Sequence, residues 1–482
     1  MSMTSDGPPR RALPLRLLGA LVPDPPVLRR PGVRVLLASR ALSELGMSAL
    51  TYGAIVHLAR EGGSPFEVSL LGASGALAAL IFGLRGGIIA DSLTKRWALG
   101  LGYAFQAALC IAVPTYLGTG LPALLSLVFT VRLLTQIVSP AVKTAVSVVA
   151  TTPELATLTT FLILAGGIGS GAGSAVLAPL LVKLFDIRIL FYAIGLILAL
   201  ASIRAFALPP GHGPGVSEEA SAGERPVAPG LWSMTGWILD NPAVSTMILS
   251  GAIVAVMADV SDTLQPVYVR SVLGTDPANT IYVFAPGAIG SLLGTVLAPF
   301  LIRWPGERWL AALSVAAFAV AMAMFGLVDQ VTPWLAPLNP LRLLNEGAMG
   351  LEDPILAAGM IAVPAKFGAA AAAVSVQTYV NTRVPVAGQG TTFGIQATLQ
   401  SGLGIAGTLG LGALADALGT RFVYLVAPAL VTAGVIWLIR TSYRAGNEPA
   451  PSRRATLASL WQEPDQADGD GSPHGRDQSP VE

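Results

Sequence analysis

Residues 69–96 read SLLGASGALAALIFGLRGGIIADSLTKR, an apolar run that ends in a short charged segment. The apolar part, 69–90, is long enough to cross a hydrocarbon core as a helix, which takes about 20 residues. Similar runs recur along the chain, and we predict twelve spans: 35–58, 69–90, 98–117, 122–144, 159–182, 189–208, 244–268, 279–302, 309–328, 354–377, 391–415 and 422–440. Backbone polar groups find no partner in lipid, and these runs are too long and too uniformly apolar for barrel strands. The sequence therefore predicts an all-α polytopic membrane protein.

The composition supports this class and excludes others. Of the 482 residues, 53% are hydrophobic and 12% are charged, against about a quarter charged in soluble proteins. Cys110 is the single cysteine, so no intrachain disulfide can form, and no metal-ligand cluster accompanies it. The sequence has no nucleophile-and-base set and no phosphate-binding Gly-Lys-Ser/Thr loop. We therefore expect no enzyme, no ATP-driven pump, no cofactor, no metal and no nucleic-acid partner.

A polar interruption divides the predicted spans into two sets of six. Residues 209–240 are rich in Pro, Gly and Glu, which is typical of a linker. We predict a basic N-terminal tail (1–34), a six-helix bundle (35–208), a cytoplasmic linker (209–240), a second six-helix bundle (241–440) and a disordered C-terminal tail (441–482). The inner loops after the second and eighth spans end alike, with Lys95-Arg96-Trp97 and Glu307-Arg308-Trp309. Such similarity favours duplication of one half.

The distribution of basic residues predicts the orientation of the chain. The outer loops carry six of the 29 Lys and Arg residues, whereas Arg29, Arg30 and Arg34 precede the first span directly. The positive-inside rule then places both termini in the cytoplasm. The N-terminal tail lacks an apolar core and a cleavage site, so we expect no cleaved signal. We expect a multi-pass monomer in the cell (plasma or inner) membrane.

The loop between the second and third spans carries a family resemblance. Gly87, Asp91, Lys95 and Arg96 resemble the signature loop of the major facilitator superfamily, although Ser92 and Thr94 depart from it. Arg132, in the middle of the fourth span, fits a second pattern of that family. The resemblance implies an alternating-access carrier in which two bundles surround a central cavity lined by helices 1, 4, 7 and 10. An acid and a basic pair at neighbouring helix ends can form contacts that break between states, so we interpret these four residues as a gate.

The fifth predicted span is similar to the glycine-rich helix of the exporters of this family. It reads GGIGSGAGSA over residues 166–175, with Ala172 where the exporter pattern has Pro. The resemblance favours export. Small residues at this spacing also let helix backbones approach closely, and that explanation needs no transport direction.

Charged residues in the middle of apolar spans are the candidate coupling and substrate residues. A charge at this depth costs a few kcal/mol unless it faces a partner or water. The five residues are Glu44 in the first span, Arg132 in the fourth, Asp259 and Asp262 in the seventh, and Lys366 in the tenth. We predict two pairs, Glu44 with Arg132 and one of the aspartates with Lys366. The alternatives are fixed interhelical ties, or satisfaction of Glu44 by Arg40 on the same helix.

Two tyrosines lie near the charged residues of the first and seventh spans. Tyr52 and Tyr268, just beyond the acids, are candidate cavity-lining residues. We expect a secondary active transporter that uses protons to export small amphipathic or drug-like compounds. The alternatives are uptake of a small metabolite, lipid movement, or a non-transporting membrane sensor or assembly protein.

Overall fold

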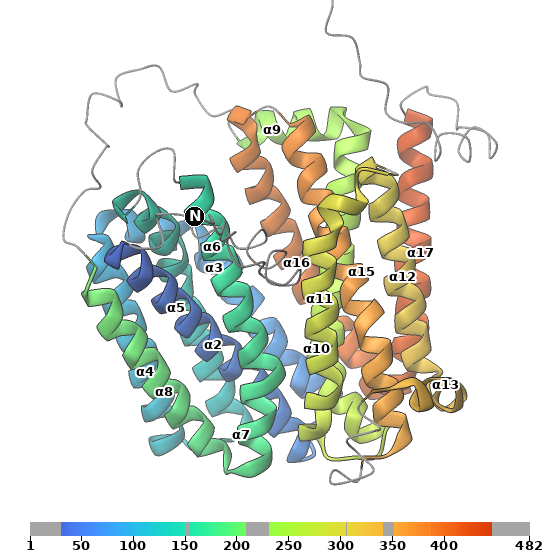
Figure 1. Cartoon of the computed structure of the whole chain (residues 1–482), viewed down its shortest axis with the longest axis horizontal. Coiled ribbons are helices and arrows are strands. Elements are labelled where there is room, and N and C mark those ends of the chain that lie inside the picture. The colour runs from blue at the N-terminus through green and yellow to red at the C-terminus, as the bar shows by residue number, and fades with distance from the viewer. Residues whose placement is uncertain are drawn as a thin grey trace, which may run out of the picture.

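The structure is a computed structural model that describes residues 30–149, 155–208, 231–304, 306–340, 351–384 and 386–445. The expected tails, most of the linker and the loop at 341–350 lie outside these ranges. Within them the chain is helical, and Figure 1 shows two groups of helices side by side, coloured blue to green and yellow-green to red.

The first group holds six membrane-length helical segments. They are α2 (Pro31–Arg60), α3 (Pro65–Ser92), α4 (Lys95–Tyr116), α5 (Leu121–Val149), the segment formed by α6 (Leu155–Ala172), a π-helix (η3, Gly173–Leu177) and α7 (Ala178–Leu184), and α8 (Ile187–Phe206). The π-helix has a local cause, because Pro179 offers no backbone N–H and crowds the carbonyl one turn earlier.

The second group also holds six long helices. They are α10 (Pro242–Ser271), α11 (Ile281–Leu301), α12 (Gly306–Gly326), α15 (Asp353–Arg383), α16 (Val386–Leu418) and α17 (Thr420–Ala445). Shorter elements join them: α9 (Leu231–Asp240), the 3₁₀ turn η5 (Pro277–Thr280), α13 (Val328–Leu335) and the 3₁₀ turn η6 (Ala336–Leu338). Helix α9 corrects the last part of our linker prediction, because residues 231–240 are helical rather than open chain.

Met234 and Ile238 of α9 are buried in a cluster with residues of α10 and α15, and α9 packs against α10 and α16. The last ten residues of the segment that we predicted as linker are therefore a helix of the second group.

The two groups repeat the same packing, as duplication predicts. Helix α2 packs on α6, α3 on α5 and α4 on α8, and the corresponding pairs α10 with α16, α11 with α15 and α12 with α17 pack in the second group. We call the groups the N bundle (α2–α8) and the C bundle (α10–α17). Their contact surfaces are mainly α2 and α3 on one side and α10 and α16 on the other.

Ten helical segments of the described chain are long and apolar enough to cross a membrane. The other two predicted spans correspond to α2, which carries Arg34, Arg40 and Glu44, and to α17, whose apolar part among the described residues is Thr420–Gly434. Both occupy the expected places in the helix order.

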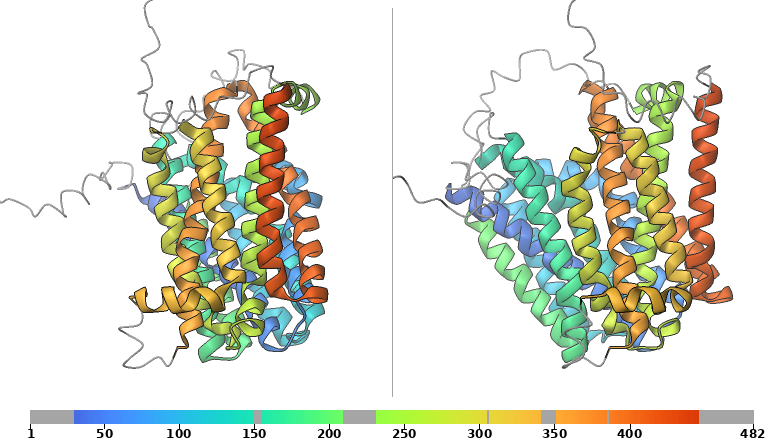
Figure 2. Two further views of the ribbon diagram at one scale, coloured as in Figure 1. Left: turned by 90° about the vertical axis from the view of Figure 1, so that its right-hand side faces the viewer. Right: turned by 45° about the vertical axis from the view of Figure 1, so that its right-hand side comes forward.

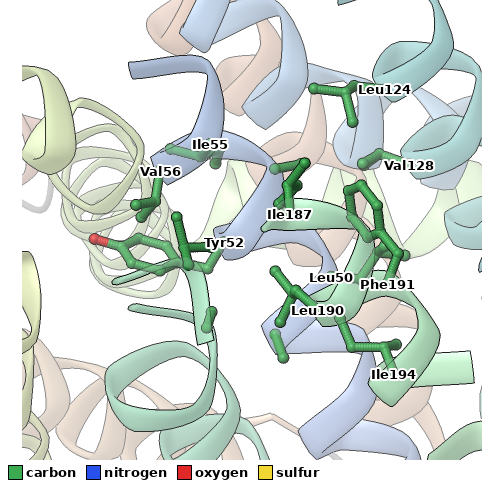
Figure 3. Packing of buried hydrophobic residues seen from close by; sticks show 14 of the residues in the cluster. Leu50, Tyr52, Ile55, Val56, Leu124, Val128, Ile187, Leu190, Phe191 and Ile194 are labelled. Carbon is green, nitrogen blue, oxygen red and sulfur yellow. The ribbon is translucent and has the colours of Figure 1, made fainter. Parts of the chain in front are cut away.

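Each bundle has its own apolar core. In the N bundle, Leu50, Leu124, Leu190 and Phe191 are at most 1% exposed and bring α2, α5 and α8 together. Figure 3 shows these side chains converging between the helices. The core fixes the rotation of α2 and thereby determines which of its residues face the C bundle.

Glycines of α6 and η3 allow the backbone of α2 to come close. A Cβ atom at Gly169 would lie 2.3 Å from the carbonyl oxygen of Ala41, and one at Gly173 would lie 2.3 Å from that of Leu45. Gly167 and Gly171, on other faces, have open space around them. The glycine-rich stretch thus has a packing role in this fold.

We expect Gly169→Ala to destabilise the protein by about 1 to 3 kcal/mol, because the new methyl group forces α2 and α6 apart. Gly171→Ala, a matched change with no neighbour within 4 Å, should leave stability unchanged. Thermal unfolding of both purified variants checks this prediction, and equal midpoints would contradict it.

Candidate functional site

A central cavity of about 520 Å³ lies between the two bundles. Its lining comes from α2, α3, α5, α6, η3, α10, α11 and α16. The lining residues are Ser48, Thr51, Tyr52, Ile55, Gly72, Gly75, Ala76, Arg132, Ser170, Ser174, Asp259, Asp262, Thr263, Phe284, Ala397, Gln400, Ser401, Gly404 and Thr408. The cavity therefore contains three of the five charged residues singled out from the sequence.

The C bundle contributes two carboxylates and a lysine to this region. Lys366 of α15 forms an ion pair with Asp262 of α10, and its ammonium lies 5.4 Å from the centre of the Phe284 ring. Asp259, almost one turn earlier on α10, is exposed, and its carboxylate makes no ion pair with a described residue. Of the two aspartates that we predicted as partners of Lys366, the structure therefore pairs Asp262 with it.

The N bundle contributes Arg132 of α5. Its Nη2 donates a hydrogen bond to Thr51 Oγ1 at 2.9 Å, while its buried Nε has no partner among the described residues. Gly75 of α3 lies over the side chain, since a Cβ atom there would be 3.5 Å from Nε. Gly287 of α11 lies over Lys366 in the same way, at 3.2 Å from its Cγ. Arg132 and Lys366 thus occupy corresponding places in the two bundles.

Glu44 does not form the predicted ion pair with Arg132. Its Oε1 lies 2.7 Å from Nη1 of Arg40, four residues earlier on α2, and both side chains are 23% exposed. Residues four apart on a helix are neighbours, so this pair forms within α2 without any help from another helix. Gly166 of α6 leaves room for it, because a Cβ atom there would lie 3.3 Å from Arg40 Nε.

The two candidate tyrosines have different surroundings. Tyr52 lines the cavity, and its ring meets that of Phe284 edge-on at 4.5 Å across the bundle interface. Tyr268 does not line it, which corrects our prediction. It is 0% exposed, packs against Phe325 and Tyr424, and donates a 2.6 Å hydrogen bond to the carbonyl of Phe325. The face of α10 that bears Tyr268 points into the C bundle.

Polar contacts fasten the bundles at the end away from the described termini, which we call the far end. Arg270 of α10 donates hydrogen bonds to the carbonyls of Ala59 at 2.7 Å and Gly63 at 3.0 Å. Arg60 lies 3.1 Å from Asp276, and Lys183 donates a 2.8 Å hydrogen bond to Asn279. Figure 2 (right) shows the bundles drawing together at this end. We call these contacts the far-end latch.

The latch determines how water reaches the cavity. Asp259 is exposed although it lies in the middle of a membrane-length helix, so solvent has access to it. The bundles also pack closely between the latch and the cavity, where a Cβ atom at Gly72 of α3 would lie 2.7 Å from Thr263 of α10. The cavity is therefore reached from the end where α2 begins and α17 ends, which we call the terminal end.

The predicted gate residues lie at the terminal end of the N bundle. Gly87 and Asp91 belong to the last turns of α3, and Lys95 and Arg96 begin α4. The side chain of Asp91 lies outside the described residues. The guanidinium of Arg96 lies 5.8 Å from the centre of the Trp97 ring.

Most of the polar side chains of the lining were not predicted from the sequence. Ser48, Ser170, Ser174, Ser401 and Thr408 come from four segments of both bundles. Ser48 and Ser170 are hydrogen-bonded to each other at 2.8 Å. Small hydroxyl residues inside apolar runs were the available signal, but a membrane helix can satisfy them within its own backbone, so the signal has little specificity. Among the described residues, no cluster of three His, Cys, Asp or Glu side chains could hold a metal ion.

Comparison with solved structures identifies the fold. The chain superposes on the nucleoside transporter NupG with a TM-score of 0.65 at 13% identity, covering 86% of this chain and 99% of that one. A bacterial homolog of the human lysosomal transporter Spinster, in an inward-facing and unoccupied conformation, gives 0.65 at 15% identity, with 89% and 98% covered. A D-xylose-proton symporter gives 0.60 at 13% identity, with 84% and 96% covered. No match was found among curated proteins.

The family is shown by the sequence itself. Residues 36–356, more than half of the chain, match the model of the Major Facilitator Superfamily. The match covers the N bundle except for the first residues of α2, and the C bundle as far as the start of α15. Members of this family are secondary transporters that bind small molecules within the bilayer, and they are not enzymes. The chain belongs to the major facilitator superfamily.

Proposed function

We propose that the chain exports small amphipathic compounds from the cytoplasm in exchange for protons. One observation carries the proposal: the exposed carboxylate of Asp259 lies beside the Asp262–Lys366 ion pair in a cavity that is closed at the far end. A carboxylate kept in the middle of a membrane helix is a candidate proton carrier.

The ion pair gives the site a way to couple protons to movement. Asp262 is on α10 and Lys366 on α15, so a shift between these helices separates the two charges. A carboxylate that loses its cation and its water binds a proton more readily. We propose that Asp262 takes up a proton when it loses Lys366, that Asp259 takes one up when it loses the cavity water, and that Arg132 contacts the substrate. Glu44 has a smaller role in proton coupling, because Arg40 already neutralises it.

The orientation and the domain roles belong to the same proposal. The terminal end lies on the cytoplasmic side of the cell membrane, so the structure corresponds to a state that is open to the cytoplasm. The two bundles rock against each other, with Asp91, Lys95 and Arg96 as the gate at the terminal end. The export direction rests on the resemblance of the glycine-rich fifth span to those of exporters. Uptake is the second candidate, because a proton symporter shares this fold.

Transport in sealed vesicles tests the proposal. The purified protein is reconstituted with an acidic lumen, and radiolabelled amphipathic amines, carboxylates and zwitterions are added outside. We expect at least one compound to accumulate in vesicles whose cytoplasmic end faces outward, and a protonophore to abolish the accumulation. Accumulation driven only by the reversed gradient would establish uptake instead. No response of any compound to the gradient would contradict proton coupling.

A further inference from the structure

Two opposite charges in the central cavity have no ion-pair partner among the described residues. Arg132 projects from the N bundle and donates a hydrogen bond to Thr51, and its buried Nε has no partner among the described residues. Asp259 projects from the C bundle and has no ion pair with a described residue. Both side chains line the same cavity, where Arg132 is close enough to feel the charges of Glu44 and Asp259, and Asp259 those of Asp262, Lys366 and Arg132.

The remaining charges of the site cancel. Asp262 is paired with Lys366, and Glu44, outside the lining, is paired with Arg40. The lining therefore offers a ligand one free cation on one wall and one free anion on the other. Neither has a substitute partner within the described part of the chain.

The rest of the lining suits a small molecule with polar ends and an apolar middle. Tyr52, Ile55 and Phe284 form an apolar patch, and Gln400, Ser401 and Thr408 of α16 supply hydrogen-bonding groups. A cavity of about 520 Å³ has room for a compound of moderate size.

We propose that the transported molecule is a zwitterion, with its anionic group on Arg132 and its cationic group on Asp259. This inference rests on the proposed function and names the substrate class of its site. Burying a charge without a partner is costly, so a ligand that neutralises both walls is favoured over one that neutralises a single wall. Such a ligand also joins the two bundles. A proton and the cationic group then compete for Asp259, as exchange requires.

Equilibrium binding in detergent, without any gradient, tests the inference. The probes are ε-aminocaproate and para-aminomethylbenzoate, each compared with its methyl ester, which is a cation, and with its N-acetyl derivative, which is an anion. We expect each zwitterion that binds to do so at least about tenfold more tightly than both of its derivatives. If neither zwitterion binds more tightly than its derivatives, the inference is overturned.

Variants assign the two walls. Arg132→Gln should remove the preference for the zwitterion over the ester, and Asp259→Asn should remove the preference over the N-acetyl derivative. Arg204→Gln and Asp416→Asn remove the same charges at exposed positions outside the cavity and should keep both preferences. A merely structural role would weaken all three probes alike, and that outcome would overturn the assignment.

The inference and the proposed function fail separately. Zwitterion-selective binding without gradient-driven flux would contradict proton-coupled transport and leave the binding site intact. Gradient-driven flux of compounds with a single charge, and none of zwitterions, would support transport and overturn the inference.

Discussion

Replacing Lys366 with methionine is expected to abolish gradient-driven transport and to destabilise the protein. The substitution leaves the Asp262 carboxylate inside the membrane without its cation. Removing one partner of a buried ion pair costs about 3 to 5 kcal/mol, and cavity water reduces this cost here because the Asp262 side chain is 35% exposed. We therefore expect a loss of about 1 to 3 kcal/mol.

Two further variants separate stability from function. The double variant Asp262→Asn, Lys366→Met removes both charges and should recover most of the stability while transport stays absent. Arg421→Gln breaks an exposed ion pair with Asp329, whose side chains are 43% and 54% exposed, and should cost less than about 1 kcal/mol. Thermal unfolding and vesicle flux are measured for the unchanged protein and for the three variants. A Lys366→Met protein that matches Arg421→Gln in both would contradict the role of the pair.

Replacing Arg270 with glutamine is expected to open the far end. The guanidinium joins the bundles by hydrogen bonds to the carbonyls of Ala59 and Gly63. These acceptors follow or end α2, where the helix terminus carries partial negative charge. Loss of a charged hydrogen bond costs about 1.5 to 3 kcal/mol, which is enough to shift a two-state population about tenfold.

Sided labelling measures that shift. In a Cys110→Ala background, Ser401→Cys places a thiol in the cavity, and an impermeant maleimide is applied from the far side of sealed vesicles. We expect Arg270→Gln to raise the far-side labelling rate about tenfold. Arg188→Gln, an exposed arginine at the same end, should not change it. Equal rates in the two variants would show that the latch does not hold the far end closed.

Much of the fold could be predicted from hydropathy, because each apolar run of membrane length must form its backbone hydrogen bonds internally. Every predicted span has a helical segment in the structure, with bounds that differ by a few residues. Helices α9 and α13 were missed because they are too short to cross a membrane.

The site was less predictable because hydropathy does not tell which face of a helix meets the cavity. Glu44 and Tyr268 lie on helices that line the cavity, α2 and α10, yet Glu44 is neutralised within α2 and Tyr268 faces the C-bundle core. The resemblance implied lining by helices 1, 4, 7 and 10. In the structure α2, α5 and α10 do line the cavity, but α15 does not, and α16 takes a large share. The rotation of each helix about its own axis decides which residues face the cavity, and that rotation depends on tertiary packing.

Distances measured at both ends of one protein test alternating access most directly. Spin labels at Leu93 and Trp304 report on the terminal end, and labels at Tyr116 and Leu338 report on the far end; all four side chains are at least 40% exposed. The distributions are recorded in reconstituted protein at acidic and neutral pH. We predict opposite changes, with the far-end distance growing as the terminal-end distance shrinks. Distances that change together, or that stay fixed at both ends, would contradict the account.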